Sequence, residues 1–304
     1  MAASYDWDCW VNPTTAASIR DGAGAYTLRL AEALLDYDAS AIGKCLSDGN
    51  VAAWINFILV SRQKLGRTCL QVACVHSDFS TVRQLVEAGA DVHAHDSEGG
   101  TTLHWLCSGD ILADINAKLD YVIAKGGASL VNASDHNGDT ALHGAACSGK
   151  SNALVKLLKT GVDANINKGG RLGRTPLHCA CEWGRTFCIR LLMEYSADVE
   201  ARKTGKDAGE TPLHVAASYN RHDCVKALLH DCGSSVNATD NDGRTALHLA
   251  VYYGCQDTLI RTLLAHPQCD VTIRDVNGLT VEDVAKRRGH SKRYRSRWLY
   301  PAKS

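Results

Sequence analysis

The sequence contains no apolar stretch long enough to cross a membrane. Its longest apolar run, VAAWINFILV at residues 51–60, has half of the roughly 20 residues that a membrane-spanning helix needs. No secretory leader is recognisable at the N-terminus. The 13 cysteines are an odd number and lack the spacing of a disulfide framework. These absences favour a protein with reduced thiols, which we expect in the cytoplasm, the nucleus or both.

Sequence patterns of catalysis are also absent. We find no Ser/His/Asp set, no glycine-rich phosphate loop and no paired carboxylates at the spacing of general acid–base chemistry. GKDAGET at residues 205–211 has glycine and lysine but lacks the spacing of a phosphate-binding loop. We therefore expect a protein that is not an enzyme and that needs no cofactor.

A ten-residue pattern recurs along most of the chain. Residues 175–184 read TPLHCACEWG, and close copies begin at Thr140, Thr211 and Thr245. Weaker copies begin at Thr68, Thr101 and Thr280. The lead threonines are separated by 33, 39, 35, 36, 34 and 35 residues, and a nearly fixed period of this length is typical of stacked repeats.

Each repeat predicts two helices. Threonine at the first position suits a helix N-cap, and proline at the next position needs no N–H there. About a dozen residues later a second segment has apolar residues at i, i+3 and i+4, as in Val82, Leu85 and Val86. Gly89 then stands where a left-handed helix stop is expected. Because no such helix pair can bury its apolar face alone, we expect the pairs to stack.

The TPLH helix start, the GADV ending of the second helix and the DxxGxT connection together resemble the ankyrin repeat. The resemblance covers about residues 66–290. It implies an all-α, ankyrin-repeat solenoid of stacked helix–turn–helix units with β-hairpin-like fingers and a concave face. We divide the chain into an N-terminal extension (1–25), a divergent capping repeat (26–65), the ankyrin-repeat array (66–285) and a basic C-terminal cap and tail (286–304).

Histidine and cysteine in this pattern could suggest a metal site or a reactive thiol. Five histidines share one repeat position: His104, His143, His178, His214 and His248. Equivalent residues on stacked units form a row with a spacing of roughly 10 Å instead of converging, so we expect no metal site. The resemblance implies that these histidines link neighbouring repeats by hydrogen bonds. It also places Cys179 on the concave side, where a reactive thiol is an alternative, while Cys181 fills a small buried position.

The variable positions of the repeat indicate a binding surface. The residue five positions after the histidine is Ser148, Trp183, Tyr219 and Tyr253 in successive repeats. We expect the three aromatic residues to form a ladder near the concave rim, although packing on the adjacent helix is an alternative. The predicted partner-binding residues of this surface are Trp105, Cys179, Glu182, Trp183, Tyr219 and Tyr253.

Two connections are longer and more basic than the others. NKGGRLGR (167–174) and RKTGKD (202–207) are predicted to contact an acidic segment of a partner, although a merely solvated loop face is an alternative. Their basic residues are Lys168, Arg171, Arg174, Arg202, Lys203 and Lys206.

The C-terminal residues 286–304 hold eight Lys and Arg and no acidic residue. A terminal repeat needs a polar outer face, but polarity alone does not call for so many positive charges. A nuclear-import signal, a nucleic-acid contact and a docking site for an acidic surface are the functional interpretations. The basic residues concerned are Lys286, Arg287, Arg288, Lys292, Arg293, Arg295 and Arg297.

The resemblance also implies a modification, because animal repeats of this kind resemble substrates of an asparaginyl hydroxylase. The matching acceptors, each with a leucine eight residues earlier, are Asn165, Asn237 and His93.

We therefore expect a non-catalytic protein–protein interaction scaffold or adaptor that binds one or more proteins through its concave face and fingers. It would act as a monomer or as a subunit of a hetero-complex. The alternative is a nuclear, nucleic-acid-associated or regulatory factor that uses the basic tail.

Overall fold

The computed structural model of the protein describes residues 29–30, 33–34, 38–47, 55–56, 58–59, 66–109, 114–160, 164–205 and 209–290. Some predictions lie outside the described residues. They concern the N-terminal extension 1–25, Lys206 in the second long finger, and Lys292, Arg293, Arg295 and Arg297 in the tail.

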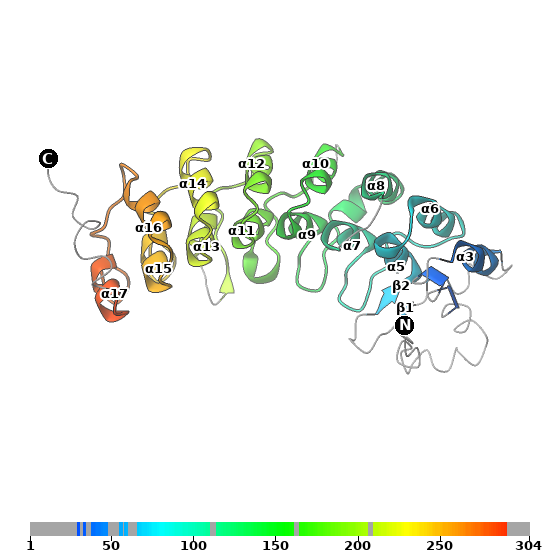
Figure 1. Ribbon diagram of the computed structural model, residues 1–304, viewed down its shortest axis with the longest axis horizontal. Coiled ribbons are helices and arrows are strands. Elements are labelled where there is room, and N and C mark those ends of the chain that lie inside the picture. Colours follow the sequence, from blue (N-terminus) through cyan, green and yellow to red (C-terminus); the bar gives the residue numbers. More distant parts are fainter. Residues whose placement is uncertain are drawn as a thin grey trace. The chain divides into compact units, whose positions relative to one another are not determined.

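The regular secondary structure of the described residues is almost entirely helical, as the repeat pattern predicts (Figure 1). One short antiparallel sheet pairs Ile58 with Thr68 and Leu59 with Arg67. In chain order the elements are α3 (Ala39–Leu46), β1 (Ile58–Leu59), β2 (Arg67–Thr68), α5 (Cys69–His76), α6 (Phe79–Glu87), α7 (Thr102–Ser108), α8 (Ile115–Val131), α9 (Ala141–Ser148), α10 (Ser151–Lys159), the 3-10 helix η2 (Arg171–Gly173), α11 (Pro176–Glu182), α12 (Thr186–Glu194), α13 (Pro212–Ser218), α14 (His222–His230), α15 (Ala246–Tyr252), α16 (Asp257–Leu264) and α17 (Val281–Arg287).

The chain divides into two compact units, which we describe separately. The divisions fall between Gly144 and Ala145, between Leu154 and Val155, and between Ala164 and Asn165. In the N-terminal unit, α5 packs against α7 and α6 packs against α8. In the C-terminal unit, the first helices α11, α13, α15 and α17 form one row, and the second helices α12, α14 and α16 form another (Figure 1).

The first helix of each repeat starts as its sequence predicts. Thr175 caps α11 with its side-chain oxygen, which accepts from the backbone N–H of His178, and Pro176 is the first helical residue. The capping box is closed by the side chain of the residue three positions after the threonine. That residue is His104, His178, His214 or His248 in four repeats, Gln71 in the first and Asp283 in the last.

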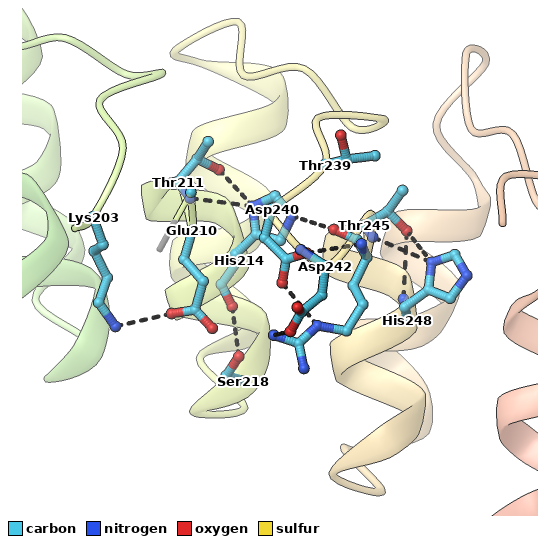
Figure 2. Close-up of polar contacts among 12 residues, drawn as sticks. Lys203, Glu210, Thr211, His214, Ser218, Thr239, Asp240, Asp242, Thr245 and His248 are labelled. Atoms are coloured by element: carbon cyan, nitrogen blue, oxygen red, sulfur yellow. Dashed lines mark hydrogen bonds and ion pairs between the residues drawn. The ribbon is translucent and has the colours of Figure 1, made fainter. Parts of the chain in front are cut away.

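The same histidines join one repeat to the next. The backbone N–H of Thr211 donates to His214 Nδ1 (3.2 Å), and His214 Nε2 donates to the carbonyl oxygen of Arg244 in the following repeat (2.9 Å). Figure 2 shows this ring beside Thr211, and His248 beside Thr245. Equivalent bonds to the following repeat hold His104, His178 and His248. The linking role that the resemblance implied is therefore confirmed for these four histidines, and the geometry fixes a neutral ring with its proton on Nε2.

The second helices and the small residues of the first helices form the core. Val82 and Leu85 of α6 are fully buried, and Gly89 takes the predicted left-handed conformation with φ 101°. Cys181 is also fully buried, as its small-residue position predicts. Close helix packing therefore depends on the periodic apolar positions that the sequence shows.

A buried lysine in α8 was not anticipated from the sequence. The side chain of Lys118 is fully enclosed, and its ammonium donates to the carbonyl oxygens of Cys74 and Ser77 at the end of α5. Burial lowers the pKa of Lys118. The lysine thus satisfies carbonyl groups that the end of a helix leaves without an intrahelical partner.

The fingers are closed by an aspartate in four connections. In the finger that precedes α15, Asp240 Oδ1 accepts from the backbone N–H groups of Asp242 (3.0 Å) and Arg244 (2.8 Å). The other three aspartates with this pair of bonds are Asp96, Asp135 and Asp275. The short polar side chain therefore pairs the turn's backbone donors, which explains the DxxGxT pattern.

Candidate protein-interaction site

Three aromatic residues at one repeat position are exposed in the C-terminal unit. Trp183, Tyr219 and Tyr253 are the C-cap residues of α11, α13 and α15, and their exposed fractions are 52%, 50% and 58%. We call these three residues the aromatic ladder. Each is followed by a residue in the left-handed region, which turns the chain toward the second helix. The side chains are thus not enclosed by neighbouring helices, so the packing alternative does not hold for them.

Arg288 continues the aromatic ladder in the last repeat, which the sequence analysis did not recognise. It is the C-cap residue of α17, equivalent to Tyr253 in α15, and it is exposed. Its Nε donates to the backbone carbonyl oxygen of Tyr252 (3.1 Å), and its guanidinium carbon lies 4.3 Å from the centre of the Tyr252 side-chain ring. The sequence already places Arg288 at this position, because aligning the degenerate last repeat on the others puts an arginine where they have an aromatic residue.

Polar groups fix the ladder on one side. Glu182 accepts from Arg174 Nη1 (2.7 Å) and is hydrogen-bonded to the Tyr219 hydroxyl. Burial raises the pKa of Tyr219, and the charge and hydrogen bond of Glu182 raise it further. Tyr253 is held by an edge-to-face contact with Tyr252, with ring centres 5.1 Å apart. Glu182 therefore orients a ladder residue, and its own carboxylate is already paired.

Cys179 does not face a partner, so this prediction is wrong. Its side chain is fully buried. The residues at the same position of α13 and α15, Val215 and Leu249, each have an exposed fraction of only 1%. The position after the histidine therefore lies inside the stack of first helices in this unit. A thiol without solvent contact also rules out the alternative of a reactive Cys179.

Trp105 belongs to the N-terminal unit and has a structural role there. Its indole N–H donates to Asp96 Oδ2 (2.7 Å), and the guanidinium carbon of Arg67 lies 3.7 Å from the ring centre. In the C-terminal unit Arg244 Nε makes the corresponding bond to Asp240 Oδ2 (2.8 Å). Trp105 thus completes the first described finger and does not belong to the aromatic ladder.

Most basic side chains of the two long fingers are used within the protein. Lys203 is buried and forms an ion pair with Glu210 Oε2 (2.9 Å), as Figure 2 shows. Arg202 donates to the carbonyl oxygens of Gly209 and Thr239, and Arg174 pairs with Glu182. The prediction that these residues face an acidic partner is wrong for Lys203, because its charge is neutralised and enclosed. Arg171 is exposed and Lys168 is half-buried.

The described part of the basic tail lies on α17 and its cap. Lys286 pairs with Glu282 (2.9 Å) and lies 3.8 Å from Asp283, while Arg287 is exposed. The tail's roles in nuclear import or nucleic-acid binding stay predictions.

The hydroxylation acceptors lie in different environments. Asn165 is exposed and His93 is half-buried. The Asn237 amide donates to the carbonyl oxygen of Gln268, and its oxygen accepts from the N–H of Asp270 (2.9 Å). The Asn237 side chain is thus engaged at both ends of its amide, and the modification stays a prediction.

Comparison with known families decides the class of repeat. The family model described as ankyrin repeats (3 copies) matches residues 116–203 and 201–275, and the single ankyrin repeat model matches residues 65–97. The chain belongs to the ankyrin-repeat family. Ankyrin repeats are generally protein-interaction modules and are typically not catalytic.

Curated relatives share the ankyrin repeats over part of their length. The chain is 41% identical to neurogenic locus notch homolog protein 1 of Homo sapiens over 127 residues, which are 41% of this chain and 5% of that protein. It is 38% identical to the notch homolog of Danio rerio over the same length. It is 32% identical to the putative palmitoyltransferase ZDHHC13 of Danio rerio over 208 residues, or 67% of this chain and 30% of that protein. The chain thus spans less than a third of each of these relatives.

No described helix is both long and apolar enough to cross a membrane. Within the same residues, no group of three or more His, Cys, Asp or Glu side chains is placed to hold a metal ion.

Proposed function

We propose that this ankyrin-repeat chain is a non-catalytic scaffold or adaptor that binds a partner protein through the aromatic ladder. The observation that carries the proposal is the exposure of Trp183, Tyr219 and Tyr253 at one position of three consecutive repeats. Tryptophan and tyrosine are enriched among the residues that dominate interface energies, because they bury large apolar areas and carry a polar group. Buried residues around them hold the repeats in place, so the surface is preorganised.

The environment of the histidines and cysteines supports a non-catalytic role. The histidine rings are occupied by capping and linking bonds. Burial raises the pKa of Cys69 and of Cys74 to about 12 and that of Cys188 to about 11, which keeps these thiols protonated at neutral pH. One relative is a putative palmitoyltransferase by its name, and our proposal does not extend that activity to this chain. The proposed adaptor works in the cytoplasm, the nucleus or both, as a monomer or within a hetero-complex.

Affinity capture with quantitative mass spectrometry tests the proposal. We expect the triple variant Trp183→Ala, Tyr219→Ala and Tyr253→Ala to recover at least about tenfold less of the specific partners than the unsubstituted protein, because hot-spot truncations cost about 1–2 kcal/mol or more each. Phe187→Ala is the matched control, since Phe187 is an exposed aromatic residue on α12 with an exposed fraction of 62%.

Recovery by Phe187→Ala should equal that of the unsubstituted protein. Circular dichroism should show the same helix content for all three proteins. Equal recovery by the triple variant would remove the aromatic ladder from the binding surface and with it the proposed function.

A further inference from the structure

The aromatic ladder has a regular period. Its residues cap α11, α13 and α15, and Arg288 takes the same place on α17. These four helices pack in sequence, each against the next (Figure 1). Packed helices lie about 8–10 Å apart, so the C-terminal unit offers one contact group at each such interval.

Few kinds of polypeptide present the same face at that interval. A polyproline II helix has three residues per turn and rises about 3.1 Å per residue, so every third residue returns to one face after about 9.3 Å. A β-strand returns to one face after about 6.6 Å and again after about 13 Å, and neither length fits. An α-helix matches only through residues seven apart, which are separated by about 10.5 Å.

Hydrogen-bonding capacity distinguishes the two kinds of segment that match the interval, the polyproline II helix and the α-helix. In the described part of the chain, the indole N–H of Trp183 and the hydroxyl of Tyr253 make no hydrogen bond. The carbonyl groups of a polyproline II segment have no internal partner and can accept from such donors. The carbonyl groups of an α-helix are already bonded, except at its C-terminus. Proline rings also pack on aromatic side chains in other known grooves.

The charges at the two ends of the aromatic ladder differ, which favours an acidic residue at one end of the bound segment. Arg287 and Arg288 are exposed at the α17 end, and Arg288 lies over Tyr252. At the other end the equivalent residue is Ser148, which carries no charge. An acidic side chain one turn beyond the last proline would therefore meet the guanidinium of Arg288.

We propose that the aromatic ladder binds a polyproline II segment of the partner, with prolines three residues apart and an acidic residue at the Arg288 end. This inference rests on the proposed function of the ladder. Polyproline II segments are close to pseudo-symmetric in shape, so the motif can run in either direction, with the acidic residue last or first.

A random dodecapeptide library displayed on phage tests the inference without assuming the intervening residues. The full chain serves as bait, and binders that the triple ladder variant also retains are removed. We expect the selected peptides to be enriched in prolines at i, i+3 and i+6, with Asp or Glu three residues beyond one end. Enrichment of another pattern, such as apolar residues seven apart without proline, or of no pattern, would overturn the proposal.

A synthetic peptide of the selected sequence then tests the individual contacts by fluorescence anisotropy. Trp183→Ala and Tyr253→Ala should each weaken binding about tenfold. Arg288→Ala should weaken binding of the acidic peptide by about threefold to tenfold and leave the peptide with alanine at that place unchanged. Moving the prolines to four-residue spacing should abolish binding, and Phe187→Ala should have no effect. Equal binding of the respaced peptide, or an equal effect of Arg288→Ala on both peptides, would contradict the proposed register.

The two proposals can fail separately. If the triple variant loses its captured proteins but the library yields no proline period, the polyproline inference is wrong and the scaffold function stands. If the triple variant captures the same proteins as the unsubstituted chain, both are wrong.

Discussion

Acidification from pH 7 to pH 4.5 should lower the free energy of unfolding of this protein by about 5 kcal/mol through two histidines alone. Burial lowers the pKa of His178 and of His214 to about 4, from an ordinary value of 6.5. The hydrogen bond at Nδ1 acts in the same direction, because Nδ1 of each ring faces a backbone N–H and a proton there would break the capping bond. The bonds from Nε2 to the carbonyl oxygens of Glu210 and Arg244 act in the opposite direction, but burial is the larger effect.

The sign follows from proton uptake. Between pH 6.5 and pH 4 the unfolded histidine binds a proton and the folded one does not, so stability rises with pH across this window. Stability is therefore lost as the pH falls through 6.5 toward 4. Each histidine accounts for about 3 kcal/mol when the window is crossed completely, and most of this is lost by pH 4.5.

The chain itself supplies the matched control. In the first repeat Gln71 takes the place of the histidine, accepts from the N–H of Thr68 and donates to the carbonyl oxygens of Ala94 and Gly100. The double variant His178→Gln and His214→Gln can therefore keep the capping and linking bonds without a titrating ring. Urea unfolding at pH 7 and at pH 4.5 should show a loss about 5 kcal/mol smaller for this variant than for the unsubstituted protein. An equal loss would contradict the assignment of the acid sensitivity to these rings.

The repeat frame was predictable from the sequence because each feature is local. Thr175 and Pro176 start a helix through short-range bonds, and the apolar period of Val82 and Leu85 follows from helix geometry. These inferences needed no knowledge of how distant side chains meet.

The sequence-based predictions that the structure contradicts, and the features that the sequence did not suggest, concern side chains whose roles depend on residues outside their local sequence pattern but close in space. From the sequence Lys203 was predicted to be a solvent-facing charge in a long loop, but it is buried and paired with Glu210, seven residues later. Cys179 sits at a position that the family varies, yet here it is fully buried. Lys118 donates to backbone carbonyl oxygens at the end of α5 and is buried there, which no local sequence pattern reveals.

Removing one member of the Lys203–Glu210 pair should have the largest effect of any single substitution in the long fingers. The side chains are 9% and 11% exposed, so water can do little to stabilise a charge left alone. Leaving an uncompensated buried charge costs about 3–5 kcal/mol. The expected result is a decrease of about 3 kcal/mol or more in the free energy of unfolding of the C-terminal unit for Glu210→Gln.

The neighbouring charges make the two members of the pair unequal. Glu210 also contributes to the raised pKa of Arg244, although burial acts there in the opposite direction and Asp240 is the main partner. Lys203→Met therefore leaves Glu210 near a second cation, whereas Glu210→Gln removes the carboxylate with which Lys203 forms its buried ion pair. We expect Lys203→Met to cost less than Glu210→Gln, and the double variant to cost at least about 1 kcal/mol less than the sum of the two.

An exposed ion pair in the same unit is the control. Arg190 lies 3.2 Å from Asp231, and their side chains are 56% and 48% exposed. Arg190→Met should change the free energy of unfolding by less than about 1 kcal/mol, because water screens that pair. Urea unfolding of the four variants and the unsubstituted protein, combined with hydrogen exchange of α11 and α13, gives the values and localises them. Additive effects of Lys203→Met and Glu210→Gln would show that the two charges do not stabilise each other, and the enlarged finger would then be held by its backbone bonds between Lys203 and residues 209–210 alone.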